Sequence, residues 1–409
     1  MVNLDTILPK RTLDALSDRA VSIAESQTLV MAQTSRDLQE QGIDIINLSI
    51  GEPDFDTPKY IKEAAKKAID DNFTHYSPVK GFKDLIQAIS DKFKRENNLD
   101  YGLDEIIVSN GAKHSIANVI LSLINYNDEV LIPAPYWVSY HEIVKIAEGK
   151  PVVLPTSIDN DFKVTPEQIQ NAITNRTKAI FINSPSNPTG SVYTREELKA
   201  IADVLYEFED IYIISDEIYE HILFEGKHAS IGQFDFIKDR VITVNGVSKG
   251  YAMTGWRIGY IGAPKFVVDA CSKIQGQYTS GPCTIAQKAS VAALCCEQDD
   301  SKKIMHDAFL KRRNLVVERL AKMPGLKVNM PNGAFYVFPE VSSYFGKKYN
   351  DEYIFTAQDL AMYLLHEANV AVVPGDAFGS PNNIRLSYAT SEENLNKALD
   401  RIENALAKL

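Results

Sequence analysis

The chain has 409 residues, of which 45% are hydrophobic and 24% charged, which is the composition of a soluble globular protein. This length exceeds what one ordinary compact core accommodates, so we expect two domains. The formal net charge of −11 disfavours a nucleic acid or an anionic membrane as partner, because like charges would have to approach each other, but it is compatible with local basic pockets for small anions.

The N-terminal segment, residues 1–19, mixes charged residues with single apolar ones. It has no uninterrupted apolar stretch, so we expect neither a secretory signal nor a membrane span there. Four cysteines lie in one region without the spacing of metal ligands, namely Cys271, Cys283, Cys295 and Cys296. The last two stand in an apolar helical context and are expected to be buried thiols. We predict no metal site and, by default, a cytoplasmic location.

Between about residues 105 and 265, short apolar runs alternate with amphipathic helices. Several runs are nearly continuous in Val, Ile and Tyr, which is typical of strands buried on both faces. Helices have clear start signals, such as the capping box of Thr194 and Glu197 and, earlier, Thr57-Pro58. This alternation predicts an α/β fold with a mostly parallel seven-stranded sheet. The expected strands are 105–109, 129–133, 151–155, 178–183, 211–215, 241–245 and 257–262.

After about residue 300 the pattern changes to a long polar helix over 302–321, followed by shorter strands and further helices. The last helix begins after Ser391. We expect a smaller α+β domain here, joined by the N-terminal fifty or so residues. The predicted domains are therefore 52–301 for the large one and 1–51 with 302–409 for the small one. The short strands are expected at 326–329, 334–338, 370–373 and 384–387.

Polar residues follow the predicted strands at the edge where such sheets bind ligands. The strand 211–215 is followed by Asp216 and Tyr219, and the strand 241–245 by Ser248 and Lys249. A lysine and an aspartate at the ends of adjacent buried strands indicate a reactive site.

Pyridoxal phosphate (PLP) requires such a set of residues. Its aldehyde needs a desolvated lysine near neutrality, and its pyridine nitrogen needs a buried carboxylate. Its phosphate needs backbone N–H groups at a helix start, a small hydroxyl residue and an arginine, and its ring needs an aromatic partner. The chain supplies each of these as Lys249, Asp216, Gly111, Ala112, Ser248, Arg257 and Trp137.

Three motifs occur in a specific order, namely Asn187-Pro-Thr-Gly190, Asp216-Glu-Ile-Tyr219 and Ser248-Lys249-x-x-x-Met253-Thr-Gly-Trp-Arg257. With them, from the segment 47–55 to the segment 385–394, the chain resembles the class I aminotransferases of PLP fold type I. It is most similar to the bacterial aspartate aminotransferase subgroup Ib. The resemblance covers nearly the whole chain and implies the fold of that class.

The resemblance implies the following roles around the cofactor ring. Lys249 would bond covalently to the cofactor aldehyde and later carry protons as general base and acid. Asp216 would hold the pyridine nitrogen. Asn187 and Tyr219 would donate hydrogen bonds to the phenolic oxygen, and Trp137 would stack on the ring.

The phosphate would be held by Ser248, Arg257 and the backbone amides of Gly111 and Ala112. Tyr76 resembles the tyrosine that reaches the phosphate of the neighbouring subunit, which implies a homodimer as the active form.

The substrates would be small amino acids and 2-oxo acids. Arg385 would bind the α-carboxylate by a two-point ion pair, helped by Gly51 and Asn187, with Trp137 alongside. In subgroup Ib a lysine at the position of Lys113 meets the distal carboxylate of aspartate or glutamate. The implied reaction moves the amino group of L-aspartate to 2-oxoglutarate in a ping-pong cycle.

Two residues depart from the family pattern and leave the substrate open. Tyr278 stands where relatives often have a small residue, and His114 follows Lys113 where glutamine is common. Both are expected near the substrate end. The alternatives are a prephenate or aromatic aminotransferase and a PLP-dependent carbon–sulfur lyase on the same fold. A PLP-binding sensor with a DNA-binding module is not expected, because the region before Gly51 has no basic recognition helix.

Single residues also have simpler interpretations. Lys113 could be solvated, Asp216 could be a helix cap, and Arg385 could form a surface ion pair. A Ser–Lys hydrolase pair is not expected from Ser248 and Lys249, because adjacent strand residues point to opposite faces.

Overall fold

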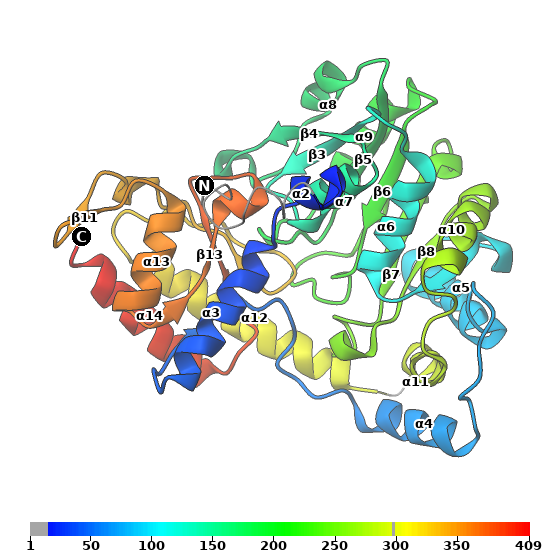
Figure 1. Ribbon diagram of the computed structural model, residues 1–409, viewed down its shortest axis with the longest axis horizontal. Helices are drawn as coiled ribbons and strands as arrows, with labels where there is room; N and C mark the ends of the chain where they lie inside the picture. The colour runs from blue at the N-terminus through cyan, green and yellow to red at the C-terminus, as the bar shows by residue number, and fades with distance from the viewer. Residues whose placement is uncertain (1–14, 297–298) are drawn as a thin grey trace.

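A computed structural model of the chain describes residues 15–296 and 299–409, and its main feature is a seven-stranded sheet (Figure 1). The strand order is β2-β8-β7-β6-β5-β3-β4. Strand β8 runs antiparallel to β2 and β7, and the other neighbouring pairs are parallel. The predicted α/β fold with a mostly parallel seven-stranded sheet is confirmed. The strands are β2 (Ile106–Ser109), β3 (Glu129–Ala134), β4 (Lys150–Pro155), β5 (Thr177–Asn183), β6 (Tyr212–Asp216), β7 (Val241–Gly246) and β8 (Gly259–Gly262).

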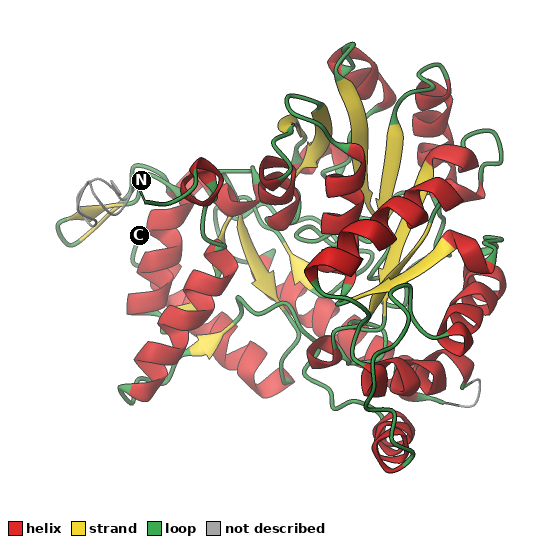
Figure 2. Ribbon diagram, turned by 45° about the vertical axis from the view of Figure 1, so that its right-hand side comes forward, coloured by secondary structure: helices red, strands yellow, loops and turns green. Residues whose placement is uncertain are grey.

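Helices cover both faces of this sheet (Figure 2). They are α5 (Lys83–Asn97), α6 (Ala112–Leu123), α7 (Ser139–Ile146), α8 (Pro166–Ala172), α9 (Arg195–Tyr206) and α10 (Lys265–Tyr278). Farther from the sheet, α11 (Thr284–Cys295) lies against α5, and α4 (Lys59–Asp70) packs on α11 (Figure 1). On one face Val130 and Ile132 of β3 share a core with α6, α7 and α10, and on the other Leu131 shares a core with α8 and α9. Because neighbours in one strand enter two different cores, the run has to be apolar throughout.

The helix-start signals were predicted correctly. Thr194 caps α9, with Glu197 completing the capping box, Pro58 precedes α4, and Ser391 caps the last helix, α14 (Glu392–Leu406).

The second part of the molecule contains α12 (Ser301–Leu320), α13 (Ala357–Glu367) and α14 around small sheets. Its three-stranded sheet has the order β13-β14-β9, and β1 pairs in parallel with β12. The N-terminal segment contributes α3 (Gln27–Glu40) and β1, whereas α2 (Asp18–Ser22) lies against α7. The division into domains 52–301 and 1–51 with 302–409 stays a prediction. The small strands are β1 (Ile46–Asn47), β9 (Tyr336–Val337), β10 (Lys348–Tyr349), β11 (Glu352–Tyr353), β12 (Val370–Ala371), β13 (Val373–Pro374) and β14 (Ile384–Ser387).

Two strand predictions need correction. No strand forms over 326–329, where Lys327 makes one isolated bridge to Glu340 and the Asn329 side chain donates instead to the Thr189 carbonyl oxygen. Strand β8 begins two residues later than predicted, because Arg257 has a φ of 55° in the left-handed region, which no strand accommodates.

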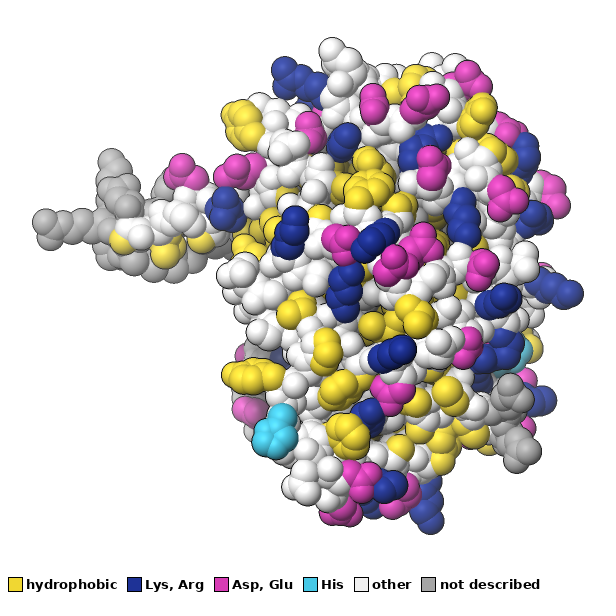
Figure 3. Space-filling view, turned by 90° about the vertical axis from the view of Figure 1, so that its right-hand side faces the viewer, with side chains coloured by type: hydrophobic (Ala, Val, Ile, Leu, Met, Phe, Trp, Pro, Cys, Tyr) yellow, Lys and Arg dark blue, Asp and Glu magenta, His cyan; other side chains and the backbone are white. Residues whose placement is uncertain are grey.

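The prediction that Cys295 and Cys296 are buried was wrong. Cys295 is exposed and Cys296 is half-buried, because the end of α11 leaves the core; all four thiols are free. Part of the predicted signal-free N-terminus, residues 1–14, lies outside the described residues. None of the described helices is long and apolar enough to cross a membrane, and the cytoplasmic location stays a prediction. On the face shown in Figure 3, basic and acidic side chains are interspersed.

Candidate active site

The carboxyl ends of β5, β6 and β7 open into a cavity of about 240 Å³. Most of the residues predicted from sequence line this one cavity. They are Gly51, Ala112, Lys113, Trp137, Asn187, Asp216, Tyr219, Ser248, Lys249, Arg257 and Arg385. Gly111 adjoins it as the N-cap of α6, and Tyr76 does not line it. The chain thus brings together residues from positions 51 to 385, which confirms the expectation that the strand ends meet.

Lys249 lies in the turn after β7 with its amine in the buried part of the cavity. Its Nζ donates a hydrogen bond to the Gly51 carbonyl oxygen at 2.6 Å. Burial lowers the pKa of Lys249 to about 8; Glu52 opposes this shift, and the positive charges of Arg257 and Arg385 add to it. A substantial fraction of this amine is therefore neutral near physiological pH, as a nucleophile requires.

Asp216 is the last residue of β6, and its partner in the neighbouring strand β7 is Val244. Burial raises the pKa of its carboxyl group to about 6, although two hydrogen bonds oppose the shift. Tyr140 donates to Oδ2 at 2.6 Å, and the Ile218 amide donates to Oδ1 at 3.2 Å. The carboxylate is thus held in place and would gain from a cationic partner.

An anion-binding end is formed by α6 and Arg257. The first residue of α6, Ala112, follows Gly111, which has a φ of 84°. This φ favours glycine, and a Cβ at Gly111 would lie 2.3 Å from Arg257 Nη2, so another residue would also push the guanidinium aside. The free N–H groups of the helix start and the guanidinium together suit a phosphate.

Ser248 also lines the cavity, next to Lys249. Both residues lie in a turn and not in a strand, so the expectation that they face opposite sides was based on the wrong local structure.

Arg385 is 2% exposed and lies in the central strand β14. Its Nη1 donates to Asn187 Oδ1 at 2.9 Å, and its Nη2 donates to the Ser49 carbonyl oxygen at 2.6 Å. The central carbon of its guanidinium group, Cζ, lies 4.6 Å from the centre of the Tyr336 ring. Its buried Nε has no hydrogen-bond partner among the described residues, so one donor of this guanidinium is left for a ligand to satisfy.

A second cation, Lys113, lies in the same cavity with its Nζ 4.9 Å from the centre of the Trp137 ring. Burial lowers its pKa, and the nearby charge of Arg257 lowers it further. Lys113 is nevertheless an exposed residue of the single chain, so its interpretation as a solvated side chain stays open beside its place in the cavity.

Several cavity residues were missed from the sequence. Tyr140 precedes any distinctive motif but lies one helical turn after Trp137, and that spacing could have found it. Tyr336, whose hydroxyl is 2.8 Å from that of Tyr219, comes from the distant strand β9 and had no sequence signal. Ser26 and Thr28, at the start of α3, also line the cavity.

Tyr278 and His114 do not line the cavity of this chain, contrary to expectation. Tyr278 is 70% exposed at the end of α10, and His114 Nδ1 accepts a hydrogen bond from the Asn110 amide. Tyr76 is 98% exposed, so its side chain is almost uncovered by the residues that the structure describes.

Comparisons with known proteins agree with this arrangement. Residues 43–402 match the family model described as aminotransferase class I and II. A probable aspartate/prephenate aminotransferase of Rickettsia conorii is 48% identical over 397 residues, which are 96% of this chain and 99% of that protein. The aspartate aminotransferase structure of Rhizobium meliloti has a TM-score of 0.93 at 43% identity, covering 96% of this chain and 99% of that one. The Thermus thermophilus aspartate aminotransferase structure with maleate has a TM-score of 0.90 at 43% identity, with the same coverage.

Proposed function

The chain belongs to the class I and II aminotransferases, which are PLP-dependent enzymes, and on that premise we propose that it moves the amino group of L-aspartate to 2-oxoglutarate. The proposed cycle is ping-pong, with pyridoxal 5'-phosphate as the resident cofactor. The observation that carries the aspartate assignment is the pair of cations that line one cavity, the buried Arg385 and the more exposed Lys113.

The residues of the cavity fit PLP. The phosphate would be held by Arg257, Ser248 and the N–H groups at the start of α6. Gly111 has no Cβ to push against the Arg257 guanidinium there. The buried Asp216 carboxylate would hold the ring nitrogen, Trp137 would cover the ring, and Asn187 and Tyr219 would hold its phenolic oxygen. When bound, PLP supplies an aldehyde that bonds to amines and a ring that accepts electrons from the substrate α-carbon.

Lys249 would do two things in the cycle. Its amine would anchor the cofactor. Once the substrate amine has displaced it, Nζ would take the proton from the substrate α-carbon and, acting as an acid, would deliver it to the carbon that had been the cofactor aldehyde. A pKa of about 8 suits both roles near neutral pH, because proton transfer in each direction is then close to balanced. Burial of this side chain also keeps bulk water away from the transferred proton.

Arg385 would orient the substrate by its α-carboxylate, using the Nε that has no partner among the described residues. Asn187 already accepts a hydrogen bond from Nη1 and fixes the plane of the guanidinium. Lys113 would then bind the distal carboxylate. The Thermus thermophilus relative was solved with maleate, a dicarboxylate, which supports the same assignment here.

A second acceptor, prephenate, is favoured by the Rickettsia conorii relative, which is described as acting on aspartate and prephenate. Prephenate also has two carboxylates, and the rings of Trp137 and Tyr336 in this cavity could pack against its six-membered ring.

The proposal includes a homodimer in which Tyr76 reaches the phosphate site of the neighbouring subunit. Its side chain is 98% exposed in the single chain, which supports a role outside its own subunit.

The decisive experiment is the absorbance spectrum of the purified PLP-loaded protein before and after excess L-aspartate, with no oxo acid present. We expect the band of lysine-bound cofactor to be replaced by that of its aminated form, with one oxaloacetate released per site. A spectrum that ignores aspartate but responds to an aromatic amino acid would contradict the aspartate assignment. A protein that binds no PLP at all would contradict the role of Lys249.

A further inference from the structure

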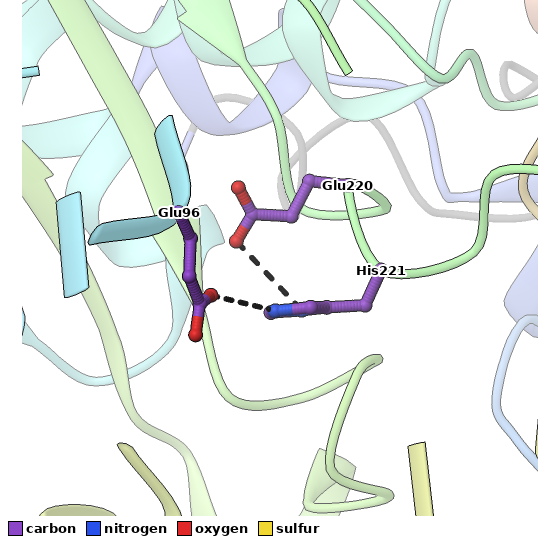
Figure 4. A group of neighbouring side chains, drawn as sticks. All are labelled: Glu96, Glu220 and His221. Carbon is purple, nitrogen blue, oxygen red and sulfur yellow. Dashed lines mark hydrogen bonds and ion pairs between the residues drawn. The ribbon is translucent and has the colours of Figure 1, made fainter. Parts of the chain in front are cut away.

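The turn after β6 presents two different faces. Asp216 and Tyr219 line the cavity, whereas Glu217, Glu220 and His221 of the same turn do not. Figure 4 shows that the side chains of Glu220 and His221 converge with that of Glu96. A group of charged side chains thus lies on the same turn as two of the proposed active-site residues but outside the cavity.

Glu220 is anchored from α5. The ammonium group of Lys92, which is fully buried, donates a hydrogen bond to Glu220 Oε1 and another to Asn97 Oδ1 at 2.7 Å. Asn97 in turn donates to Glu220 Oε2. Burial alone would raise the pKa of Glu220, but Lys92, His221 and His228 lower it to about 2. Both carboxylate oxygens are therefore charged and engaged at neutral pH.

His221 extends this group toward Lys249. Its Nε2 lies 3.0 Å from Glu96 Oε2, and its Nδ1 lies 3.7 Å from Glu220 Oε1. A Cβ at Gly250 would lie only 2.4 Å from His221 Nδ1, so the imidazole rests on the backbone of the residue next to Lys249. One cluster therefore contacts the turn of Asp216 and the turn of Lys249.

A metal ion is not the natural occupant of this cluster, although Glu96, Glu220 and His221 offer oxygen and nitrogen atoms within 4.8 Å of one another. Lys92 already neutralises Glu220, and it also lies 3.8 Å from Glu96. A buried divalent cation would have to displace or repel this ammonium.

We propose that Glu220 and His221 are positioning residues for the aminotransferase reaction, a proposal that rests on the function given above. Anchored through Lys92 to α5, Glu220 fixes the turn that aims Asp216 and Tyr219 into the cavity. His221 fixes the backbone beside Lys249. Neither residue touches substrate or cofactor, and their contribution is to hold the groups that do.

The test uses the PLP-loaded enzyme and the variants Glu220→Gln and His221→Ala. We measure the pH at which the absorbance band of bound cofactor changes, together with kcat and KM for aspartate. In Glu220→Gln the turn that carries Tyr219 loses its ion pair with Lys92, so the hydrogen bond from Tyr219 to the cofactor should weaken. The pH midpoint should therefore rise, and kcat should fall on the order of 10- to 100-fold. The KM should stay within about twofold, because Arg385 and Lys113 lie on other elements. His221→Ala should also raise the pH midpoint and lower kcat, but by less than Glu220→Gln does.

The matched control is Glu129→Gln. Glu129 is another buried carboxylate, which binds Lys150 at 2.8 Å and Thr174 at 2.6 Å, at the opposite end of the sheet strands from the cavity. This control should lower the thermal midpoint and leave the absorbance midpoint and kcat unchanged.

The proposal is overturned if Glu220→Gln and His221→Ala behave like Glu129→Gln, with lower thermal stability only. If Glu220→Gln does not fold, His221→Ala decides, because the His221 side chain lies partly at the surface and its removal should be tolerated. An unchanged absorbance midpoint in His221→Ala then overturns the proposal. The absorbance midpoint requires bound PLP but no turnover. An enzyme that ignores aspartate would therefore contradict the proposed substrate while the variants still decide on positioning.

Discussion

Tyr140 donates a hydrogen bond of 2.6 Å to Asp216 Oδ2, joining the start of α7 to the end of β6 beneath the candidate site. The Tyr140 ring stacks on Phe181 with its centre 4.2 Å away, so the hydroxyl has little freedom to turn elsewhere. The carboxylate that is proposed to hold the cofactor nitrogen is therefore oriented by a tyrosine outside the recognised motifs.

Tyr140→Phe should weaken catalysis through Asp216. The hydrogen bond from Tyr140 lowers the pKa of this carboxyl group, which burial has raised to about 6, so its loss should raise that pKa further. A smaller fraction is then ionised at a given pH, and kcat for aspartate should fall about tenfold, more at about pH 6 than at about pH 8. Steady-state kinetics across this range provide the measurement. The control is Tyr101→Phe, which removes another buried hydroxyl, 2.9 Å from Thr243 Oγ1 and away from the cavity.

Asp216→Asn should change the stability of the cofactor-free protein in a pH-dependent way. The folded-state pKa of about 6 is above the ordinary value of 3.8, so folding favours the protonated acid. The contribution of the protonated Asp216 to folding stability is fully present below about pH 4, and it is lost as the pH rises through about 6. The difference in the free energy of unfolding between variant and wild type should therefore grow over this pH range. It should reach the order of 3 kcal/mol in favour of the variant, because one pKa unit corresponds to about 1.4 kcal/mol.

Denaturant unfolding of both cofactor-free proteins at about pH 4.5 and pH 7.5 measures this difference. An equal difference at the two pH values would show that Asp216 titrates normally and is not desolvated. The PLP-loaded variant should nevertheless lose turnover by orders of magnitude, because it lacks the charge opposite the ring nitrogen.

The sheet could be predicted closely from sequence because its central strands are buried on both faces and begin with apolar runs, as β6 and β7 show. Of the small strands, β14 has the predicted bounds, β9 and β12 lie within predicted strands but are shorter, and β13 overlaps the end of a predicted strand. The two-residue strands β1, β10 and β11 were missed, because such short pairs are set by tertiary contacts and leave little pattern. The false strand at 326–329 has the apolar alternation of a strand but finds one bridging partner, Glu340.

The residues of the candidate site also divide into those that could be predicted from sequence and those that could not. Residues within motifs, such as Lys249 and Asp216, were found because their order along the chain is distinctive. Tyr140, Tyr336 and Thr28 were missed because each reaches the cavity from an element with no chemical motif of its own. Glu220 belongs to a recognised motif segment, yet its buried partner Lys92 is 128 residues away and cannot be paired with it from one sequence.

Lys113→Ala should change which substrates are preferred. If Lys113 binds the distal carboxylate, the variant should have a KM for aspartate on the order of 10- to 100-fold higher, with little change for phenylalanine or tyrosine. The contrast is Arg385→Lys, which keeps the charge but loses the two-point geometry and should impair all amino acids alike. Kinetics with both substrate classes distinguish the two variants. Equal losses in Lys113→Ala would show that Lys113 does not select the dicarboxylic substrates.

Tyr76 should act in the neighbouring subunit, which a mixing experiment can test. Tyr76→Ala should weaken PLP binding, and because this side chain is exposed in the single chain the substitution should not disturb the fold.

Lys249→Ala should be inactive by itself. In a mixed dimer of the two variants, one site combines an intact Lys249 with the Tyr76 of the other subunit, so activity at limiting PLP should be recovered to about half of the wild-type value per dimer. Lys249→Ala mixed with Arg385→Lys should recover nothing, because Arg385 acts within its own chain, beside Asn187. If the first mixture is no more active than Tyr76→Ala alone, Tyr76 does not complete the site across the interface.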